Sequence, residues 1–264
     1  MHLVDSHCHL YSSKFAQDHE AMIARAVEND VREFYLPNID QTSIADMLAL
    51  EAKYPDRCFS MMGLHPVSVK ANFEEELAIV KSWLDRRSFV AVGEIGLDLY
   101  WDKTFFEQQK SAFRTQIGWA KALGLPIVIH SRNSTAEVLE ILRELHDDRL
   151  RGIFHCFGGS VSEAKAITEL GFYLGIGGVL TYKNSGLGDT LREIDLEHLV
   201  LETDAPYLAP VPHRGKRNES AYVRIVAQHL SNLKEMPLEH IAEVTTRNVQ
   251  KIFAKRETSL YLRP

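Results

Sequence analysis

VAVGEIGLD, residues 90–98, is a short apolar run that one acidic residue, Glu94, interrupts. An amphipathic segment follows at residues 105–123, where apolar residues recur with the spacing of a helix. Gly124 then stands directly before another apolar run, a position at which a glycine commonly ends a helix. A strand, a helix and a second strand in this order predict a parallel β-α-β unit in the middle of the chain.

The same alternation extends from this unit toward both ends of the chain. Eight short runs are predicted strands, at residues 3–9, 31–37, 58–64, 89–95, 126–130, 152–156, 172–177 and 198–203. Helices are predicted between most of them, at residues 16–29, 42–53, 74–86, 105–123, 134–146 and 161–170. Eight such units in 264 residues indicate an α/β protein with a (β/α)8 TIM barrel, and a doubly wound open sheet is the alternative. Because no linker rich in Pro, Gly or Ser divides the chain, we expect one barrel domain at residues 1–254 and a loose charged tail at residues 255–264.

Composition limits the function classes. Lys plus Arg total 30 and Asp plus Glu total 36, so a net charge of −6 argues against a protein that coats nucleic acid or membranes by charge alone. The three cysteines form no C-x-x-C pair and are too few for a disulfide framework, which fits a reducing cytoplasm. No apolar run approaches the length of a membrane span. We therefore expect a cytoplasmic, monomeric protein without membrane contact.

The stretch VDSHCHL, residues 4–10, places two histidines one residue apart. On a strand, His7 and His9 would share one face and Cys8 would point to the other. Two convergent imidazoles suggest a metal site. On its own, however, this spacing is equally typical of two exposed or hydrogen-bonded histidines.

Ionisable residues recur at the ends of the other predicted strands, where barrel enzymes place their chemistry. With the first pair they form a set of six: His7, His9, Glu94, His130, His155 and Asp204. An ionisable group inside an apolar run is costly unless it is paired or bound to a metal. Six such residues at one rim therefore predict a metal site.

Four imidazoles and two carboxylates are more ligands than one four-coordinate ion needs. We therefore expect two divalent ions bridged by Glu94. The histidines His7 and His9 would hold one ion and His130 and His155 the other, with Asp204 as a terminal ligand. Two ions and two carboxylates leave this site positive, so it would attract anions although the protein is acidic.

Other polar residues at the rim are candidates for binding phosphate. They are His65 in GLHP, Arg132 just after His130, and Lys216 and Arg217 in the basic loop RGKR, residues 214–217. The alternatives are a hydrogen-bonding His65, an Arg132 paired with a surface acid, and a solvated basic turn. Asp98 and Glu202 are expected to orient metal-binding histidines.

The motifs DSHCHL, GLHP, AVGEIGLD, PIVIHSR, HCFGG, ETDAPYLAP and RGKRNE follow one another from residue 4 to about residue 253. In this order they resemble the TatD-type metal-dependent deoxyribonucleases, which are amidohydrolase-like barrels. The resemblance implies a cytoplasmic barrel hydrolase that uses a divalent metal, often Mg²⁺, to cleave DNA phosphodiesters, typically as a 3′–5′ exonuclease. The metal positions of that family fall on the same six residues. Ser220 departs from the pattern, because the family often has proline after the Asn-Glu pair.

We therefore expect two-metal hydrolysis of DNA, with single strands or 3′ ends as the substrate. Glu94 and Asp204 would be the catalytic residues, and Asp204 would accept the proton of the attacking water. The resemblance implies activity with Mg²⁺ or Mn²⁺, whereas imidazole ligands also suit Zn²⁺. A metal-dependent hydrolase of another bond, such as an aminoacyl ester or a cyclic amide, is the alternative. A non-catalytic binding protein is a third class, against which the full set of six ligands argues. The absence of G-x-S-x-G, H-E-x-x-H and Walker A motifs removes the common serine, zincin and P-loop enzymes.

Overall fold

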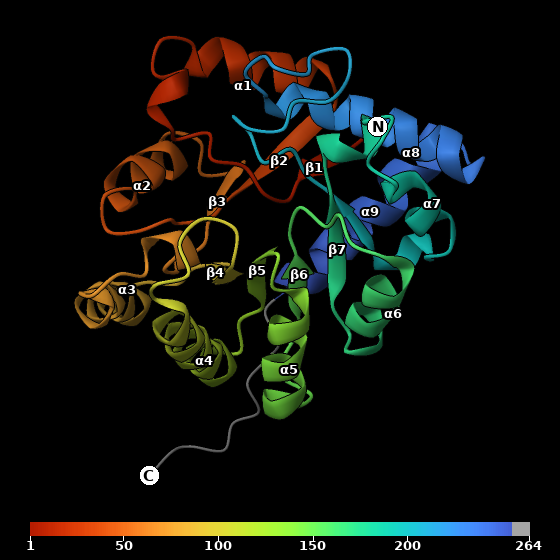
Figure 1. Ribbon diagram of the computed structural model, residues 1–264. Coiled ribbons are helices and arrows are strands. Elements are labelled where there is room, and N and C mark those ends of the chain that lie inside the picture. The colour runs from red at the N-terminus through yellow and green to blue at the C-terminus, as the bar shows by residue number, and fades with distance from the viewer. Residues whose placement is uncertain (255–264) are drawn as a thin grey trace.

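The computed structural model describes residues 1–254, and the predicted tail at residues 255–264 lies outside them. Eight short strands form parallel ladders in chain order, from β1 to β3 and from β4 to β8. The strands are β1 (Leu3–Asp5), β2 (Val31–Leu36), β3 (Cys58–Ser60), β4 (Val92–Asp98), β5 (Ile127–Arg132), β6 (Gly152–Phe154), β7 (Tyr173–Ile176) and β8 (Leu199–Leu201). Figure 1 shows the helices surrounding these strands.

Backbone hydrogen bonds close the two ladders into one barrel. Between β3 and β4, the Val90 N–H donates to Ser60 O at 3.1 Å. Between β8 and β1, the Ser6 N–H donates to Leu201 O at 3.0 Å. The predicted (β/α)8 barrel is thus confirmed, and the open doubly wound sheet is wrong.

Nine α-helices are present among the described residues. They are α1 (His19–Glu28), α2 (Ile44–Lys53), α3 (Phe73–Arg86), α4 (Phe106–Leu123), α5 (Thr135–Leu145), α6 (Val161–Glu169), α7 (Leu187–Arg192), α8 (Val223–Lys234) and α9 (Leu238–Phe253). The first six match the predicted helices to within three residues at either end, and α4 ends at Gly124 in the left-handed conformation. Helices α7, α8 and α9 were not predicted from the sequence. No helix in residues 1–254 is long and apolar enough to cross a membrane.

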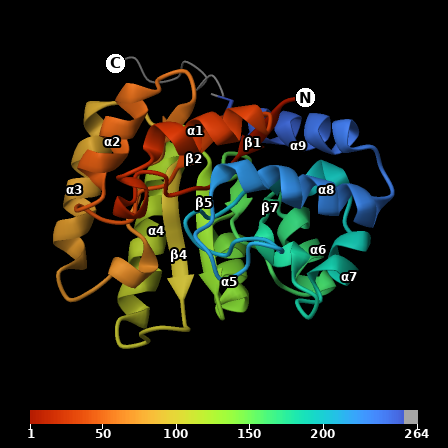
Figure 2. The ribbon, with the colours of Figure 1, turned by 90° about the horizontal axis from the view of Figure 1, so that it is seen from above.

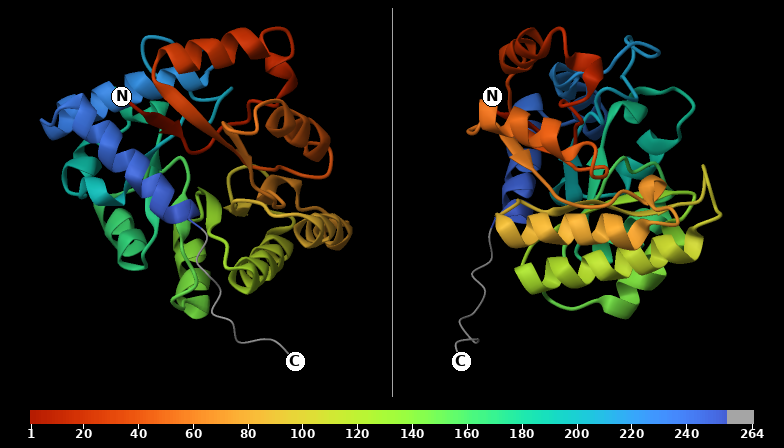
Figure 3. Two further views of the ribbon diagram at one scale, coloured as in Figure 1. Left: turned by 180° about the vertical axis from the view of Figure 1, so that it is seen from behind. Right: turned by 90° about the vertical axis from the view of Figure 1, so that its left-hand side faces the viewer.

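Helix α9 covers the N-terminal end of the barrel. Its residues Val249 and Ile252 pack with Val4, Val128 and Val200 from the inner faces of the strands. Seen from behind, α9 lies across the strands (Figure 3), and the arrowheads of β4 and β5 point away from it (Figure 2). The opposite, C-terminal end of the strands is therefore the end that is free to hold a site.

Two strand boundaries differ from the prediction in ways that move candidate ligands. Strand β1 ends at Asp5, so His7 and His9 lie in the following loop and not on a strand. Beyond Asp5 the backbone leaves the β1–β2 ladder, since Ser6 bonds to Leu201 of β8 and the Cys8 N–H donates to Tyr35 O. Strand β4 runs on to Asp98, so Glu94 lies within this strand and not at its end.

The extension of β4 depends on a glycine. Gly96 pairs with His130 of β5 and has a φ of +143°. A Cβ at this position would lie 2.0 Å from the carbonyl oxygen of His130. Only glycine therefore allows β4 to run past Glu94 beside His130.

Candidate metal centre

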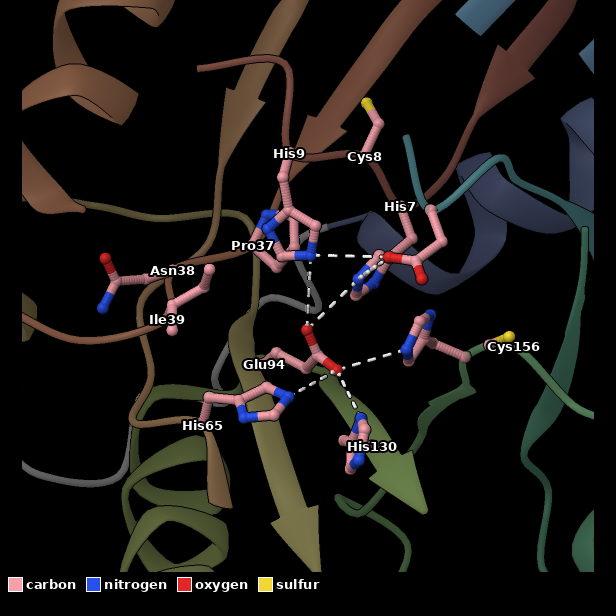
Figure 4. A network of polar contacts seen from close by, with 12 residues as sticks. His7, Cys8, His9, Pro37, Asn38, Ile39, His65, Glu94, His130 and Cys156 are labelled. Atoms are coloured by element: carbon pink, nitrogen blue, oxygen red, sulfur yellow. Dashed lines mark hydrogen bonds and ion pairs between the residues drawn. The ribbon is translucent and has the colours of Figure 1, made fainter. Parts of the chain in front are cut away.

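Five imidazoles converge on the Glu94 carboxylate, which is buried at the centre of the barrel end. Figure 4 shows His7, His9, His65 and His130 pointing toward Glu94 from different strands and loops. The sulfurs of Cys8 and Cys156 point away from it in the same view. The structure thus brings together the six predicted metal ligands and adds His65 to them.

The two oxygens of Glu94 face two different sets of nitrogens. Oε2 lies 3.2 Å from Nε2 of His7 and 3.7 Å from Nε2 of His9. Oε1 lies 3.0 Å from Nδ1 of His130 and 3.2 Å from Nε2 of His155. A carboxylate that offers one oxygen to each of two donor sets has the geometry of a bridging ligand.

Asp204 belongs to the set that faces Oε2. Its Oδ1 lies 3.5 Å from Nε2 of His9 and 3.8 Å from Nε2 of His7. Two backbone bonds hold the loop after β8 against the loop after β1: the Asp204 N–H donates to His7 O, and the His9 N–H donates to Ala205 O. Asp204 itself has a φ of +57°, a left-handed conformation that turns its side chain into the cluster.

A tyrosine determines which nitrogen of His9 faces the cluster. Tyr11 donates its hydroxyl proton to Pro37 O at 2.6 Å, so the oxygen accepts from Nδ1 of His9 at 2.8 Å. With Nδ1 protonated, Nε2 of His9 carries the lone pair that a metal ligand needs. Tyr11 was not predicted as a site residue, although its position two residues after His9 was an available signal.

Carboxylates orient His130 and His155 in the same way. Nε2 of His130 lies 2.8 Å from Oδ2 of Asp98, which leaves Nδ1 facing Glu94. Nδ1 of His155 lies 3.2 Å from Oε1 of Glu202, which leaves Nε2 facing Glu94. Asp98 and Glu202 therefore occupy the orienting positions that the sequence analysis expected.

A glycine makes room for Glu202. A Cβ at Gly175 would lie only 2.1 Å from Oε2 of Glu202. Any larger residue at this position of β7 would push the carboxylate away from His155. The orienting contact thus depends on β7 as well as on β8.

His7 provides the clearest sign that the cluster fits a metal. Both of its ring nitrogens are buried without a hydrogen-bond partner, and its side chain is fully buried. Its ring stacks on that of His155 with centroids 3.7 Å apart. A buried polar group without a partner is costly, and a divalent ion at Nε2 would satisfy that nitrogen.

His65 differs from His9, His130 and His155 in what it turns toward Glu94. Its Nδ1 accepts the backbone N–H of Val67 at 3.0 Å, so in the neutral ring the proton is on Nε2. That Nε2 lies 3.3 Å from Oε1 of Glu94. His65 thus presents a donor to the centre and not a lone pair.

Charge in the cluster favours ionised carboxylates. Burial opposes ionisation of Glu94, but the imidazoles of His65, His155 and His7 outweigh it and hold its pKa well below the usual range. Burial likewise opposes ionisation of Asp204, and the hydrogen bond from His9 and the other imidazoles lower its pKa. Two carboxylates that stay ionised near neutral pH make the cluster attractive to cations.

Comparison with known proteins agrees with this geometry. The family model described as TatD related DNase matches residues 4–254. The chain belongs to the TatD family. It is 40% identical over 252 residues to the uncharacterized metal-dependent hydrolase YabD of Bacillus subtilis, covering 95% of this chain and 98% of that protein.

Solved structures of the TatD family have the same fold. The crystal structure of YjjV, a TatD homolog from Escherichia coli K12, matches with a TM-score of 0.90 and 32% identity over 95% of this chain and 97% of that chain. A TatD family hydrolase from Entamoeba histolytica matches with a TM-score of 0.79 and 21% identity over 96% and 98% of the two chains, which supports the fold alone. As a TatD-family member, the protein is a metal-dependent hydrolase.

The predicted phosphate-binding residues of this TatD-family chain occupy different surroundings. Arg132 stacks its guanidinium on Tyr100, with 3.8 Å between the guanidinium carbon and the ring centroid. Lys216 is exposed. Arg217 turns toward α1, where it donates to both carboxylate oxygens of Asp18 and to Lys14 O. The structure therefore does not bring Arg217 into the cluster.

Ser220, which departs from the family's sequence pattern, takes part in a buried hydrogen-bond network. The Ser220 hydroxyl donates to Oδ2 of Asp5 at 2.6 Å, and the Thr203 hydroxyl donates to the same oxygen. Proline at position 220 could not make this contact. This buried network was not predicted from the sequence; it connects β1, the end of β8 and the basic loop.

Proposed function

We propose that this TatD-family protein hydrolyses DNA phosphodiesters with two divalent ions. One ion would bind His7, His9 and Asp204, the other His130 and His155, and Glu94 would join both. The observation that carries the proposal is the division of these nitrogens between the two oxygens of Glu94. The unpartnered nitrogens of buried His7 support it.

Two ions bound there would supply Lewis acidity to a water molecule and to the phosphoryl oxygens. Asp204, ionised and partly exposed, is the side chain that would accept the proton of the attacking water. His65 would donate its Nε2–H to a phosphate oxygen, which is the role that its tautomer supports. Lys216 and Arg132 would supply positive charge to the phosphates outside the cluster.

The cleavage polarity, the metal and the oligomeric state are proposed from the family resemblance. We propose cleavage from the 3′ end, activity with Mg²⁺ or Mn²⁺ and a monomeric enzyme. The imidazole-rich ligand set also suits Zn²⁺. The free thiols of Cys8, Cys58 and Cys156 support a reducing, cytoplasmic location.

Digestion of end-labelled single-stranded DNA tests the proposal. The purified enzyme, reconstituted with Mg²⁺, Mn²⁺ or Zn²⁺ in separate samples, is incubated with a 5′-labelled and a 3′-labelled oligonucleotide. We expect a ladder of shortening products from the 5′-labelled strand and early release of labelled mononucleotide from the 3′-labelled strand.

A panel with an RNA strand, a lactone, a cyclic amide and an aminoacyl ester is run in parallel. Rapid hydrolysis of the lactone, the cyclic amide or the ester with no cleavage of DNA would reject the nuclease proposal and leave a metal-dependent hydrolase of another bond. Cleavage of the RNA strand alone would make the enzyme a ribonuclease. Loss of label from the 5′ end first would reverse the proposed polarity. Asp204→Asn, which keeps the size of the side chain, controls for a contaminating nuclease.

A further inference from the structure

Exposed apolar side chains gather around the metal centre. Nine large hydrophobic residues are exposed among the described residues, and six of them lie in the loops that follow β3, β4 and β8: Val67, Tyr100, Trp101, Tyr207, Leu208 and Val211. Large apolar side chains that share one end of a barrel commonly mark a binding surface. The loop after β4 holds the two most exposed of the nine.

Tyr100 and Trp101 form an aromatic pair in this loop. Their side chains are 51% and 66% exposed, and their rings meet edge to face with centroids 4.9 Å apart. The Arg132 guanidinium lies over the Tyr100 ring at 3.8 Å and lies 5.3 Å from the Trp101 ring. Arg132 is exposed, and no ion pair within residues 1–254 involves it.

The aromatic pair is attached to the metal centre through Asp98. One carboxylate oxygen of Asp98 accepts the backbone N–H groups of Tyr100 and Trp101 at 2.9 and 3.0 Å. The other oxygen lies 2.8 Å from Nε2 of His130. One side chain therefore fixes both the base of the aromatic loop and a candidate metal ligand.

The far side of the loop is held near His65. Lys70, which follows the short helical turn after His65, lies 3.2 Å from a carboxylate oxygen of Asp102. The aromatic loop thus lies between the ends of β3 and β5, on the side of the cluster that holds His65 and His130.

We propose that Tyr100, Trp101 and Arg132 form a stacking platform for an unpaired nucleobase of the DNA strand whose phosphodiester lies at the metal centre. The platform rests on the proposed nuclease function and names the form of its substrate. An exposed indole face binds any base by stacking, and a neighbouring guanidinium adds a cation–π contact and charge for the adjacent phosphate. A base inside a duplex has both faces covered, so the platform selects single strands and unpaired ends.

Binding is measured with the metal-loaded enzyme and a single-stranded, phosphorothioate-linked oligonucleotide that resists cleavage. Fluorescence anisotropy of a 5′ dye gives the Kd. Trp101→Ala is expected to weaken binding by about 5- to 100-fold, the usual range for one stacked base. Trp101→Phe keeps an aromatic face and should restore most of the affinity.

A second probe identifies the stacked group. The same oligonucleotide is prepared with abasic residues at its 3′ end. The wild-type enzyme should bind this probe about as weakly as Trp101→Ala binds the intact strand, and Trp101→Ala should not distinguish the two probes. Arg132→Ala should also weaken binding of the intact strand, whereas Arg143→Ala, which removes an exposed charge from α5, should not.

Kinetics on unmodified DNA separate this inference from the function on which it rests. We expect Trp101→Ala to raise KM with little change in kcat, and to lose the preference for single strands. An enzyme that cleaves DNA while Trp101→Ala keeps the wild-type Kd, KM and strand preference would overturn the platform and leave the nuclease proposal intact. An enzyme that cleaves no DNA with any metal would reject both.

Discussion

Four of the five imidazoles of the centre have a protonation pattern that one neighbouring group defines. Tyr11, Asp98 and Glu202 direct a lone pair of His9, His130 and His155 toward Glu94, whereas Val67 directs the Nε2–H of His65 there. Three candidate ligating nitrogens and one donor therefore surround the same carboxylate, together with His7, whose ring nitrogens have no hydrogen-bond partner. The sequence identifies the histidines, but only the fold shows which nitrogen faces inward.

Glu94→Gln tests the bridging carboxylate. The amide keeps the size of the side chain but offers only one carbonyl oxygen, so one donor set loses its shared ligand. We expect a folded protein that has lost most of its metal and nearly all hydrolytic activity. Elemental analysis gives the metal content and circular dichroism checks the fold. An unchanged metal content would reject the bridge, and wild-type activity would reject a catalytic role.

The variants His65→Ala and His130→Ala should behave differently. His130→Ala removes a ligating nitrogen and should lower metal content together with activity. His65→Ala removes a donor and should keep the metal while kcat falls by about 10²-fold or more. Metal content and kcat are measured on the same preparations. Equal loss of metal from the two variants would make His65 a ligand and disprove the role assigned from its tautomer.

Asp5 gives a prediction for stability against pH. Burial raises the pKa of the Asp5 carboxyl to about 7, against hydrogen bonds from Ser220 and Thr203 that lower it. The folded protein therefore retains a proton that the unfolded chain releases near pH 4, so Asp5 costs stability increasingly from about pH 4 to pH 7 and by a constant amount above pH 7.

Asp5→Asn should accordingly be more stable than the wild type, with a difference that grows from pH 4 to pH 7 and reaches up to about 4 kcal/mol. Urea unfolding of both proteins in EDTA measures the difference, because the histidines titrate equally in each. Asp46→Asn on the exposed face of α2 is the matched control. A difference that is constant over this pH range would show that Asp5 does not change protonation on folding.

At the scale of elements, the loop after β8 is bound to helix α1, a structural role that its basic sequence does not indicate. Arg217 bonds to Asp18 at 2.6 Å and to Lys14 O at 2.7 Å, and Arg25 of α1 bonds to Glu219 at 2.6 Å. These contacts fasten the loop to α1. Lys216 remains on the exposed part of the loop.

Lys216→Ala and Arg217→Ala should therefore have different effects. Lys216→Ala is expected to raise KM for DNA and flatten its dependence on salt, because fewer counterions are released, with thermal stability unchanged. Arg217→Ala should lower stability by about 1 kcal/mol, the upper range for exposed ion pairs. Thermal unfolding and KM at two salt concentrations check both variants. If Arg217→Ala raised KM without lowering thermal stability, Arg217 would instead be a substrate-binding residue.

The alternation of strands and helices was predictable because period-2 and period-3.6 patterns follow from local geometry. The end of β1 was not predictable from such local patterns. It depends on backbone hydrogen bonds from the next residues to Leu201 of β8 and to Tyr35. Helix α7 has only six residues and offers little periodicity. Helix α9 does carry buried Ile241, Val244 and Val249 at helical spacing, so its omission was avoidable.

At the scale of the whole molecule, the two ends of the barrel differ: one end is packed with apolar side chains and the other holds the candidate metal centre. Helix α9 fills one end of the strands with apolar side chains, while the other end collects imidazoles, carboxylates and exposed aromatic rings. The sequence predicted the end with the imidazoles and carboxylates, because ionisable residues interrupt the apolar runs in strand order, but it did not predict that α9 fills the other end. It did not predict the direction of Arg217 or the contact of Arg132 with Tyr100, since these depend on how separate loops fold together.

The central claim is that Glu94 joins two ions that together support hydrolysis. The most direct test titrates metal-free protein with Mn²⁺ and measures bound ion and DNA cleavage in the same samples. We predict two Mn²⁺ per chain in the wild type, cleavage that rises as the second ion binds, and at most one Mn²⁺ with negligible cleavage in Glu94→Gln. Full activity with a single bound ion, or a Glu94→Gln protein that binds two ions and cleaves DNA, would contradict the account.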